Sequence, residues 1–289
     1  MLLTGCGAGS LNDSRAQLQD SPSALPTATS ETTPSPTPSP TPSPTPSPSP
    51  SPPAIVDGAG AGKSLAETET AIRSPATHPG ELATLGRRQQ VLYRTLVANP
   101  AWRADALAQL PPALVPVASA NIEAGAELRA LTRPQQSLPP WRIVEPPPAN
   151  ELLAHYKQAE AEFGIPWQYL ASIHLVESRL GRIRGTSPAG AQGPMQFIPS
   201  TWARYGRGDI NNPLDSILAA GRYLKAAGAP GNMARALYAY NHSDRYVKAI
   251  TLYAEQMMKD ERAWLGYYHW QVFYRTVNGD VELPVGYGS

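Results

Sequence analysis

Glu177 is the side chain of this sequence best placed for acid–base chemistry. It follows Leu170 and Ile173 and precedes Leu180 at a three-and-four spacing, so a helix would put this carboxylate on an otherwise apolar face. Burial and the unpaired carbonyls of a last helical turn both raise the pKa of a carboxyl group there. A pKa near neutrality suits a general acid. The alternative is a solvated carboxylate at the edge of the stripe, paired with Arg179, Arg182 or Arg184.

A glycine-rich loop follows this helix. Pro166 suits the first helical turn and Gly181 suits the exit, because glycine tolerates positive φ. The stretch 187–193 (SPAGAQG) can bring its backbone close to a ligand, and residues 195–197 then present one amide between two apolar side chains. A helix begins again at 199–202. Flat apolar contact with a few directed hydrogen bonds suits a sugar.

Three motifs, in this order, resemble the lytic transglycosylase domain of the goose-type lysozyme-like superfamily. They are Glu177-Ser178, the run SPAGAQGPMQFIPSTW at 187–202, and Ala239-Tyr240-Asn241. The resemblance covers about residues 150–260. It implies a mainly α, lysozyme-like fold (α+β) that acts on peptidoglycan glycan strands without a cofactor or metal.

The resemblance also implies a mechanism. Glu177 would protonate the oxygen that joins N-acetylmuramic acid to N-acetylglucosamine, and its carboxylate would then take the proton of the muramic 6-hydroxyl, giving a 1,6-anhydro end. Tyr240 would donate a hydrogen bond to this carboxylate, and Asn241 would orient the cleft or hold loop backbone. The implied substrate-binding residues are Ser178, Ser187, Gly193, Met195, Gln196, Phe197, Tyr240 and Asn241.

Most glycosidases use two carboxylates, whereas the motif supplies one. Asp209 lies in a loop and Asp215 in a first helical turn, so we interpret both as structural. His174 lacks the partners of a metal site and is interpreted as a core residue or a support for the acid.

The sequence also departs from the family pattern. Arg179-Leu180-Gly181-Arg182 stands where the family has an aromatic residue and Asn-Pro, and Pro194 replaces an aliphatic residue. The subfamily therefore stays open. These arginines either meet acidic peptide stems on the glycan or serve solubility.

Two other functions remain open. A hydrolytic muramidase would use the same acid with a positioned water. A catalytically silent, wall-binding scaffold lipoprotein would use the helical region 64–133 to recruit cell-wall proteins.

The N-terminal part has no capacity to fold on itself. Of the 32 prolines, 13 lie between Pro22 and Pro53, and hardly any apolar side chain accompanies them, which predicts a disordered stalk. Cys6, the only cysteine, ends a Leu-Thr-Gly-Cys stretch that resembles a bacterial lipobox, although a basic leader is lacking. We interpret it as a lipidation site that anchors the chain outside the cytoplasm, at the outer face of the cytoplasmic membrane. The alternative is an incidental thiol.

A formal net charge of +1, with no basic run, excludes nucleic acid as the expected partner. No apolar run reaches the roughly 20 residues that span a bilayer.

Periodicity and breakers give the domain plan. We expect a tether at 1–20, a Ser/Thr/Pro-rich linker at 21–63 ending in a flexible Gly/Ala joint, a helical region at 64–133, a connector at 134–149, the catalytic domain at 150–262 and an extension at 263–289. The expected helices cover 64–73, 80–98, 102–110, 113–131, 150–163, 166–180, 213–226, 233–240 and 243–258.

The alternating pattern of the extension at 263–289 predicts a β-hairpin with Asn278-Gly279 as its two-residue turn. Its aromatic side chains either anchor the hairpin on the helices or line a carbohydrate groove. They are Tyr267, Tyr268, Trp270 and Tyr274.

Overall fold

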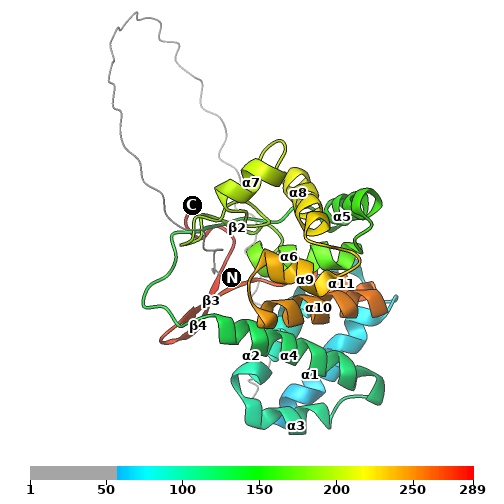
Figure 1. The fold of residues 1–289 in the computed structure, drawn as a ribbon. Coiled ribbons are helices and arrows are strands. Elements are labelled where there is room, and N and C mark those ends of the chain that lie inside the picture. The colour runs from blue at the N-terminus through cyan, green and yellow to red at the C-terminus, as the bar shows by residue number, and fades with distance from the viewer. Residues whose placement is uncertain (1–56) are drawn as a thin grey trace, which may run out of the picture. The chain divides into compact units, whose positions relative to one another are not determined.

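The computed structural model describes residues 57–289, whose fold is shown in Figure 1. Cys6, the tether and the proline-rich stretch lie outside the described residues. The described part is mainly helical with a hairpin near its C-terminal end, so the predicted fold class is confirmed. None of its helices combines the length and the apolar character needed to cross a membrane.

The helices of this part are α1 Gly58–Arg73, α2 Leu82–Ala98, α3 Arg103–Leu107, α4 Val115–Leu131, α5 Ala149–Phe163, α6 Trp167–Ser178, α7 Pro199–Tyr205, α8 Pro213–Ala226, α9 Met233–Tyr240, α10 Asp244–Lys259 and α11 Arg262–Tyr268. The strands are β1 Arg142–Ile143, β2 Ile183–Arg184, β3 Val272–Thr276 and β4 Gly279–Leu283. Short 3-10 turns, each starting at a proline, precede α2, α3 and α4.

Helix α6 lies at the centre of the fold, in contact with α5, α8 and α10 (Figure 1). Every residue from Leu170 to Ser178 is buried, and not only the face that the spacing predicted. A helix that is apolar nearly all round is stable only when neighbours enclose it. The glutamate in its last turn is thereby removed from water.

Helix α1 corrects the prediction of a flexible joint at 54–63, because residues 58–63 are helical. The Asp57 side chain caps the helix by accepting from the Gly60 amide. The glycines allow close packing on α3: a Cβ on Gly62 would lie 2.2 Å from the carbonyl oxygen of Ala106. Composition indicated flexibility here, whereas the small residues serve helix–helix contact.

The N-terminal helices share one hydrophobic core with the region predicted as catalytic. Leu65, Leu92 and Ile122 belong to the same buried cluster as Leu170 and Ile250. Helix α10 packs against α4 on one side and α6 on the other. The N-terminal helices therefore support the central helix through α10.

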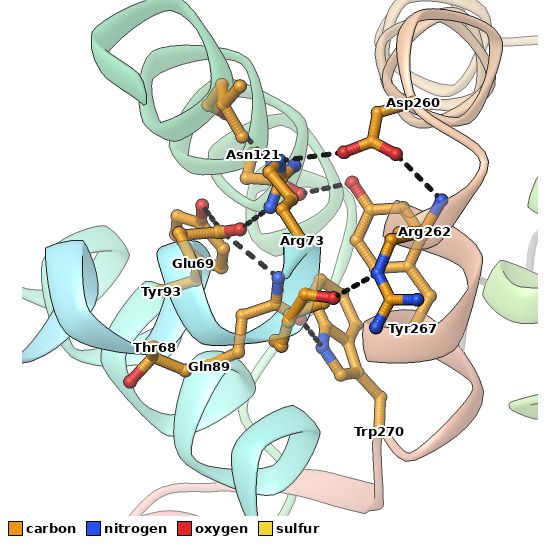
Figure 2. Close-up of polar contacts among 12 residues, drawn as sticks. Thr68, Glu69, Arg73, Gln89, Tyr93, Asn121, Asp260, Arg262, Tyr267 and Trp270 are labelled. Atoms are coloured by element: carbon orange, nitrogen blue, oxygen red, sulfur yellow. Dashed lines mark hydrogen bonds and ion pairs between the residues drawn. The ribbon is translucent and has the colours of Figure 1, made fainter. Parts of the chain in front are cut away.

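A buried polar network joins α1 and α2 to the C-terminal segment (Figure 2). Glu69 is fully buried, pairs with Arg73 and accepts hydrogen bonds from Tyr93 and from Gln89, the latter at 3.0 Å. Gln89 in turn accepts from the Trp270 indole at 2.9 Å. Because each partner is satisfied, the network fixes Trp270 relative to α1 and α2.

The C-terminal hairpin pairs β3 with β4, and its register differs by one residue from the prediction. Thr276 faces Gly279, so the two loop residues are Val277 and Asn278. Gly279 alone takes the positive φ, at 117°. Tyr267 at the end of α11 and Trp270 just before β3 are buried against the helices, with ring centroids 4.9 Å apart. This placement agrees with anchoring of the hairpin.

The connector contributes a strand. β1 pairs antiparallel with β2, with Ile143 opposite Ile183, directly after the end of α6. A second small core forms around this pair and the base of the hairpin; its residues are Trp141, Ile143, Ile183, Val272 and Leu283. The proline-rich connector is therefore an ordered part of the described fold.

The packing of α1 gives a prediction. Gly62→Ala is expected to lower the free energy of unfolding by about 1–3 kcal/mol, because the new methyl group meets the backbone of α3. Chemical denaturation followed by circular dichroism measures it.

The control is Gly60→Ala in the same helix, where the Cβ would meet only the Asp57 carboxylate at 3.2 Å. It should change stability by less than about 0.5 kcal/mol. Equal effects of the two substitutions would contradict close packing at Gly62.

Candidate active site

Glu177 occupies the last turn of α6 and is only 4% exposed. Its Oε1 accepts a hydrogen bond of 2.8 Å from the hydroxyl of Tyr246 on α10. Burial raises the pKa of Glu177 to about 7, and the Tyr246 hydrogen bond opposes part of this rise by stabilising the ionised form. The carboxyl group can therefore donate or accept a proton near neutral pH.

The helix ends immediately after this residue. Arg179, Leu180 and Gly181 all have positive φ, of 54°, 61° and 82°. The hydroxyl of Ser178 accepts from the Gly181 amide at 2.9 Å and donates to the carbonyl oxygen of Pro194. Ser178, predicted to contact substrate, is fully buried and ties the helix end to the following loop.

Ser187 closes the loop on itself. Its hydroxyl accepts from the amides of Ala189 and Ala191, at 3.2 and 2.9 Å, and its own amide donates to the Ala191 carbonyl at 2.9 Å. The side chain is buried. Its role in this structure is to hold the loop conformation.

The second half of the loop is closely packed and strained. A Cβ on Gly193, whose φ is 73°, would lie 2.1 Å from the carbonyl oxygen of Ile210. Gln196 also has a positive φ, of 51°, and donates from Nε2 to the Gly193 carbonyl at 2.9 Å. Its Oε1 is buried without a hydrogen-bond partner among the described residues. Such strain and an unused acceptor are typical of a ligand site.

The aromatic side chains of α9 and α10 form a ladder beside the acid. Tyr240 stacks parallel to Tyr246 with centroids 6.4 Å apart and meets the Phe197 ring at 6.0 Å. Its hydroxyl donates to the Met195 carbonyl at 2.6 Å. The structure therefore differs from the predicted bond between Tyr240 and Glu177: the Tyr240 hydroxyl donates to the loop carbonyl, and Tyr246 donates to the Glu177 carboxylate.

Three other predicted side chains are placed as follows. Met195 and Phe197 are buried in the main core. Asn241 is buried at the end of α9, and its backbone N–H donates to the Leu237 carbonyl at 3.0 Å. Met195 and Phe197 thus anchor the loop on either side of Gln196.

His174 lies one turn before Glu177 and is fully buried. Its Nδ1 is 2.7 Å from the Tyr156 hydroxyl. Burial lowers the pKa of His174 to about 3, so the ring is uncharged at neutral pH. It belongs to the core, as predicted.

The two aspartates hold loop structure. Asp215 accepts from the Asp209 amide at 2.9 Å, and Asp209 accepts from the Asn211 amide at 2.9 Å. Neither is among the groups that shift the pKa of Glu177. Over residues 57–289, no cluster of three or more His, Cys, Asp and Glu side chains is arranged to hold a metal ion.

Sequence reasoning missed two residues of the site. Tyr246 lies 69 positions from Glu177, so only the packing of α10 on α6 brings them together. Arg179 was interpreted as a partner of Glu177 or as an arginine that meets peptide stems or serves solubility, and its position over the Trp270 ring was not predicted. No local pattern marks either contact.

Comparison with known proteins agrees with this geometry. Residues 155–262 match the family described as Transglycosylase SLT domain. The chain is also 32% identical over 122 residues to the membrane-bound lytic murein transglycosylase F of Thiobacillus denitrificans (strain ATCC 25259 / T1). This match covers 39% of the chain and 26% of that relative. No solved structure matches the chain significantly.

The site predicts a pH effect for Tyr246→Phe. Loss of the hydroxyl removes a bond to the ionised carboxylate, so the pKa of Glu177 should rise above about 7 by about 1. Titration of the carboxyl carbon by NMR measures this change. Tyr240→Phe is the control, because its hydroxyl bonds the Met195 carbonyl; an equal rise there would contradict the assigned donor.

Burial of Glu177 also predicts a cost in stability. Its pKa is raised in the folded state from 4.5 to about 7, so the folded state binds the proton more tightly and stability falls as pH rises through this interval. Glu177→Gln should therefore stabilise the protein at pH 8.5, by up to about 3 kcal/mol, and have little effect at pH 4.5. Denaturation at both pH values measures it. A gain that is the same at both would contradict a raised pKa.

Proposed function

We propose, from the transglycosylase SLT domain at residues 155–262, that this chain is a peptidoglycan lytic transglycosylase that cleaves between N-acetylmuramic acid and N-acetylglucosamine and leaves 1,6-anhydro ends. The observation that carries the proposal is the buried carboxyl group of Glu177, with a pKa of about 7, at the end of α6. The name of the relative, a lytic murein transglycosylase, supports the substrate class.

One carboxyl group can perform both proton transfers. Protonated Glu177 donates its proton to the bridging oxygen as the bond from this oxygen to the muramic C1 breaks, and N-acetylglucosamine leaves as an alcohol. The carboxylate then takes the proton of the muramic 6-hydroxyl as its oxygen bonds to C1. The acid is regenerated and no water is consumed. A pKa near 7 makes both forms accessible at neutral pH.

The surroundings of the acid fit a sugar ring. The half-buried ring of Tyr240, backed by Phe197, offers flat apolar contact. The unpaired Oε1 of Gln196 can accept a hydrogen bond from a sugar hydroxyl or an acetamido N–H. Tyr246 holds the carboxylate from the side of α10.

A hydrolytic muramidase is the second candidate. It needs a base that positions water, and the two aspartates considered for this role are bonded within their own loop. That arrangement favours the lyase. A catalytically silent scaffold would not need a buried carboxyl group with a raised pKa, such as that of Glu177.

We also propose an extracytoplasmic location at the cell wall. The family resemblance and the lipobox-like sequence ending at Cys6 support it. The lipid anchor would hold the chain at the membrane, and the proline-rich stretch would extend its reach toward the wall.

Digestion of purified peptidoglycan in H₂¹⁸O tests the reaction. We expect released muropeptides to carry anhydro ends and no ¹⁸O, because the muramic 6-oxygen, not water, bonds to C1. Mass spectrometry reads both features at once. Reducing ends labelled with ¹⁸O would replace the lyase with the muramidase.

Glu177→Gln is the matched variant, since it keeps the shape and removes the acid. Release should fall by about 10²- to 10⁴-fold. Release by the unaltered protein that does not exceed that of the variant would support the silent scaffold.

A further inference from the structure

A pocket of about 670 Å³ opens beside the proposed acid, formed by α2, α4, α10, the end of α6 and the hairpin. Val176 and Arg179, which flank the Glu177-Ser178 pair in the chain, both line it, and Pro188 brings the loop to its edge. Tyr253 lines it from α10, seven residues after Tyr246. Seven residues span about 10 Å of helix, so the pocket lies about two turns of α10 from the carboxylate.

Arg179 is the central charge of this pocket. Its guanidinium lies over the Trp270 ring, 5.7 Å from the centroid. Among the described residues, no carboxylate forms an ion pair with it and no hydrogen-bond acceptor takes its side-chain donors. Burial, and the nearby charges of Arg94 and Arg182, lower the pKa of Arg179 to about 10, which still leaves it charged at neutral pH. A half-buried guanidinium without an anionic partner is free to bind the carboxylate of a ligand.

The other charges of the pocket have the same sign. Arg94 and Arg129 share one carboxylate, Asp280, at 2.5 and 2.9 Å. Arg275 donates to the backbone carbonyls of Arg129 and Thr132, at 3.0 and 2.7 Å. The pocket is therefore rich in guanidinium groups and carries an excess of positive charge, which attracts an anion.

The walls of the pocket are aromatic and held in place. Tyr93 and Trp270 line it, and both are bonded into the buried network of Glu69 and Gln89 (Figure 2). The Trp270 ring beneath Arg179 thus has a fixed position. A rigid wall favours one orientation of the guanidinium, whose planar fork suits bidentate binding of a carboxylate.

We propose that Arg179 and this pocket bind a carboxylate of the peptide stem attached to the glycan strand, so that the site prefers strands that carry peptides over bare glycan. This inference rests on the proposed function for its substrate. A peptide stem branches from the muramic residue whose C1–oxygen bond would be cleaved, so its carboxylates lie near the scissile bond. Neutral sugar hydroxyls would not require several guanidinium groups around one pocket.

Binding to two matched ligands tests the inference. Uncross-linked glycan strands that carry peptide stems are compared with the same strands after an amidase has removed the peptides. Because the amidase leaves a lactyl carboxylate on each muramic residue, the two ligands differ in the peptide and its carboxylates and not in the presence of charge. Dissociation constants are measured by calorimetry with the full-length chain carrying Glu177→Gln, so that no ligand is cleaved. We expect binding of the peptide-bearing strands to be at least about tenfold tighter, as one charge-assisted bidentate contact provides.

Arg179→Gln in the same background should reduce this preference about tenfold or more. Arg179→Lys keeps the charge but loses the planar guanidinium that binds a carboxylate through two hydrogen bonds, so an intermediate preference is expected. Arg88→Gln, on α2 and paired with Glu67, removes a charge outside the pocket and should leave the preference unchanged. Melting temperatures verify that each variant is folded.

Equal affinities of the Glu177→Gln chain for the two strands would overturn the inference. It would also be overturned if Arg179→Gln weakened the affinity for both strands equally. If Arg179→Gln does not fold, the salt dependence of the preference decides: the ratio of the two affinities should fall from low to high salt. A salt-independent preference would overturn the inference. Analysis of the products of the unaltered chain tests the proposed function separately. If the products carry anhydro ends but binding shows no preference for peptide-bearing strands, the proposed function stands and only the role of the pocket is overturned.

Discussion

The desolvation of one carboxyl group is the constraint on which this structure depends. Glu177 sits where helix α6 is enclosed, and burial raises its pKa from 4.5 to about 7. Tyr246 limits the rise by bonding the ionised form at 2.8 Å. The folded state thus carries a carboxyl group that can change its protonation near neutral pH, at a cost in stability that the surrounding core must offset.

The enclosure of α6 comes from helices distant in the sequence. Helices α5, α8 and α10 contact α6. Helix α10 in turn packs against α4. Leu92 and Ile122 in the N-terminal helices belong to the same core as Leu170. The helical region that precedes the matched SLT segment is therefore part of what keeps the acid dry, and its network around Glu69 also fixes Trp270 in the pocket wall.

Local pattern predicted much of this fold and little of its tertiary contacts. The proline start at 213 gave the first residue of α8, the expected helix at 233–240 matches α9, and spacing predicted the burial of Glu177. The same reasoning took residues 58–63 for a flexible joint, because glycine that permits close packing on α3 is locally indistinguishable from glycine in a linker. Tyr246 was not predicted, because its contact with Glu177 spans 69 positions. The family motif indicated Tyr240 as the donor instead.

The early end of α6 explains how one short segment can serve both the acid and the pocket. Had the helix continued to residue 180, as its spacing predicted, the side chains of Glu177 and Arg179 would lie about 200° apart around the axis. Instead α6 ends at Ser178 and Arg179 takes a φ of 54°. Glu177 then meets Tyr246 while Arg179 lines the pocket with Tyr253, and these two tyrosines lie on the same face of α10. The left-handed turn thus brings a carboxyl group and a guanidinium to one helix face, which is the arrangement that the proposed function requires for a glycan bond and its peptide substituent.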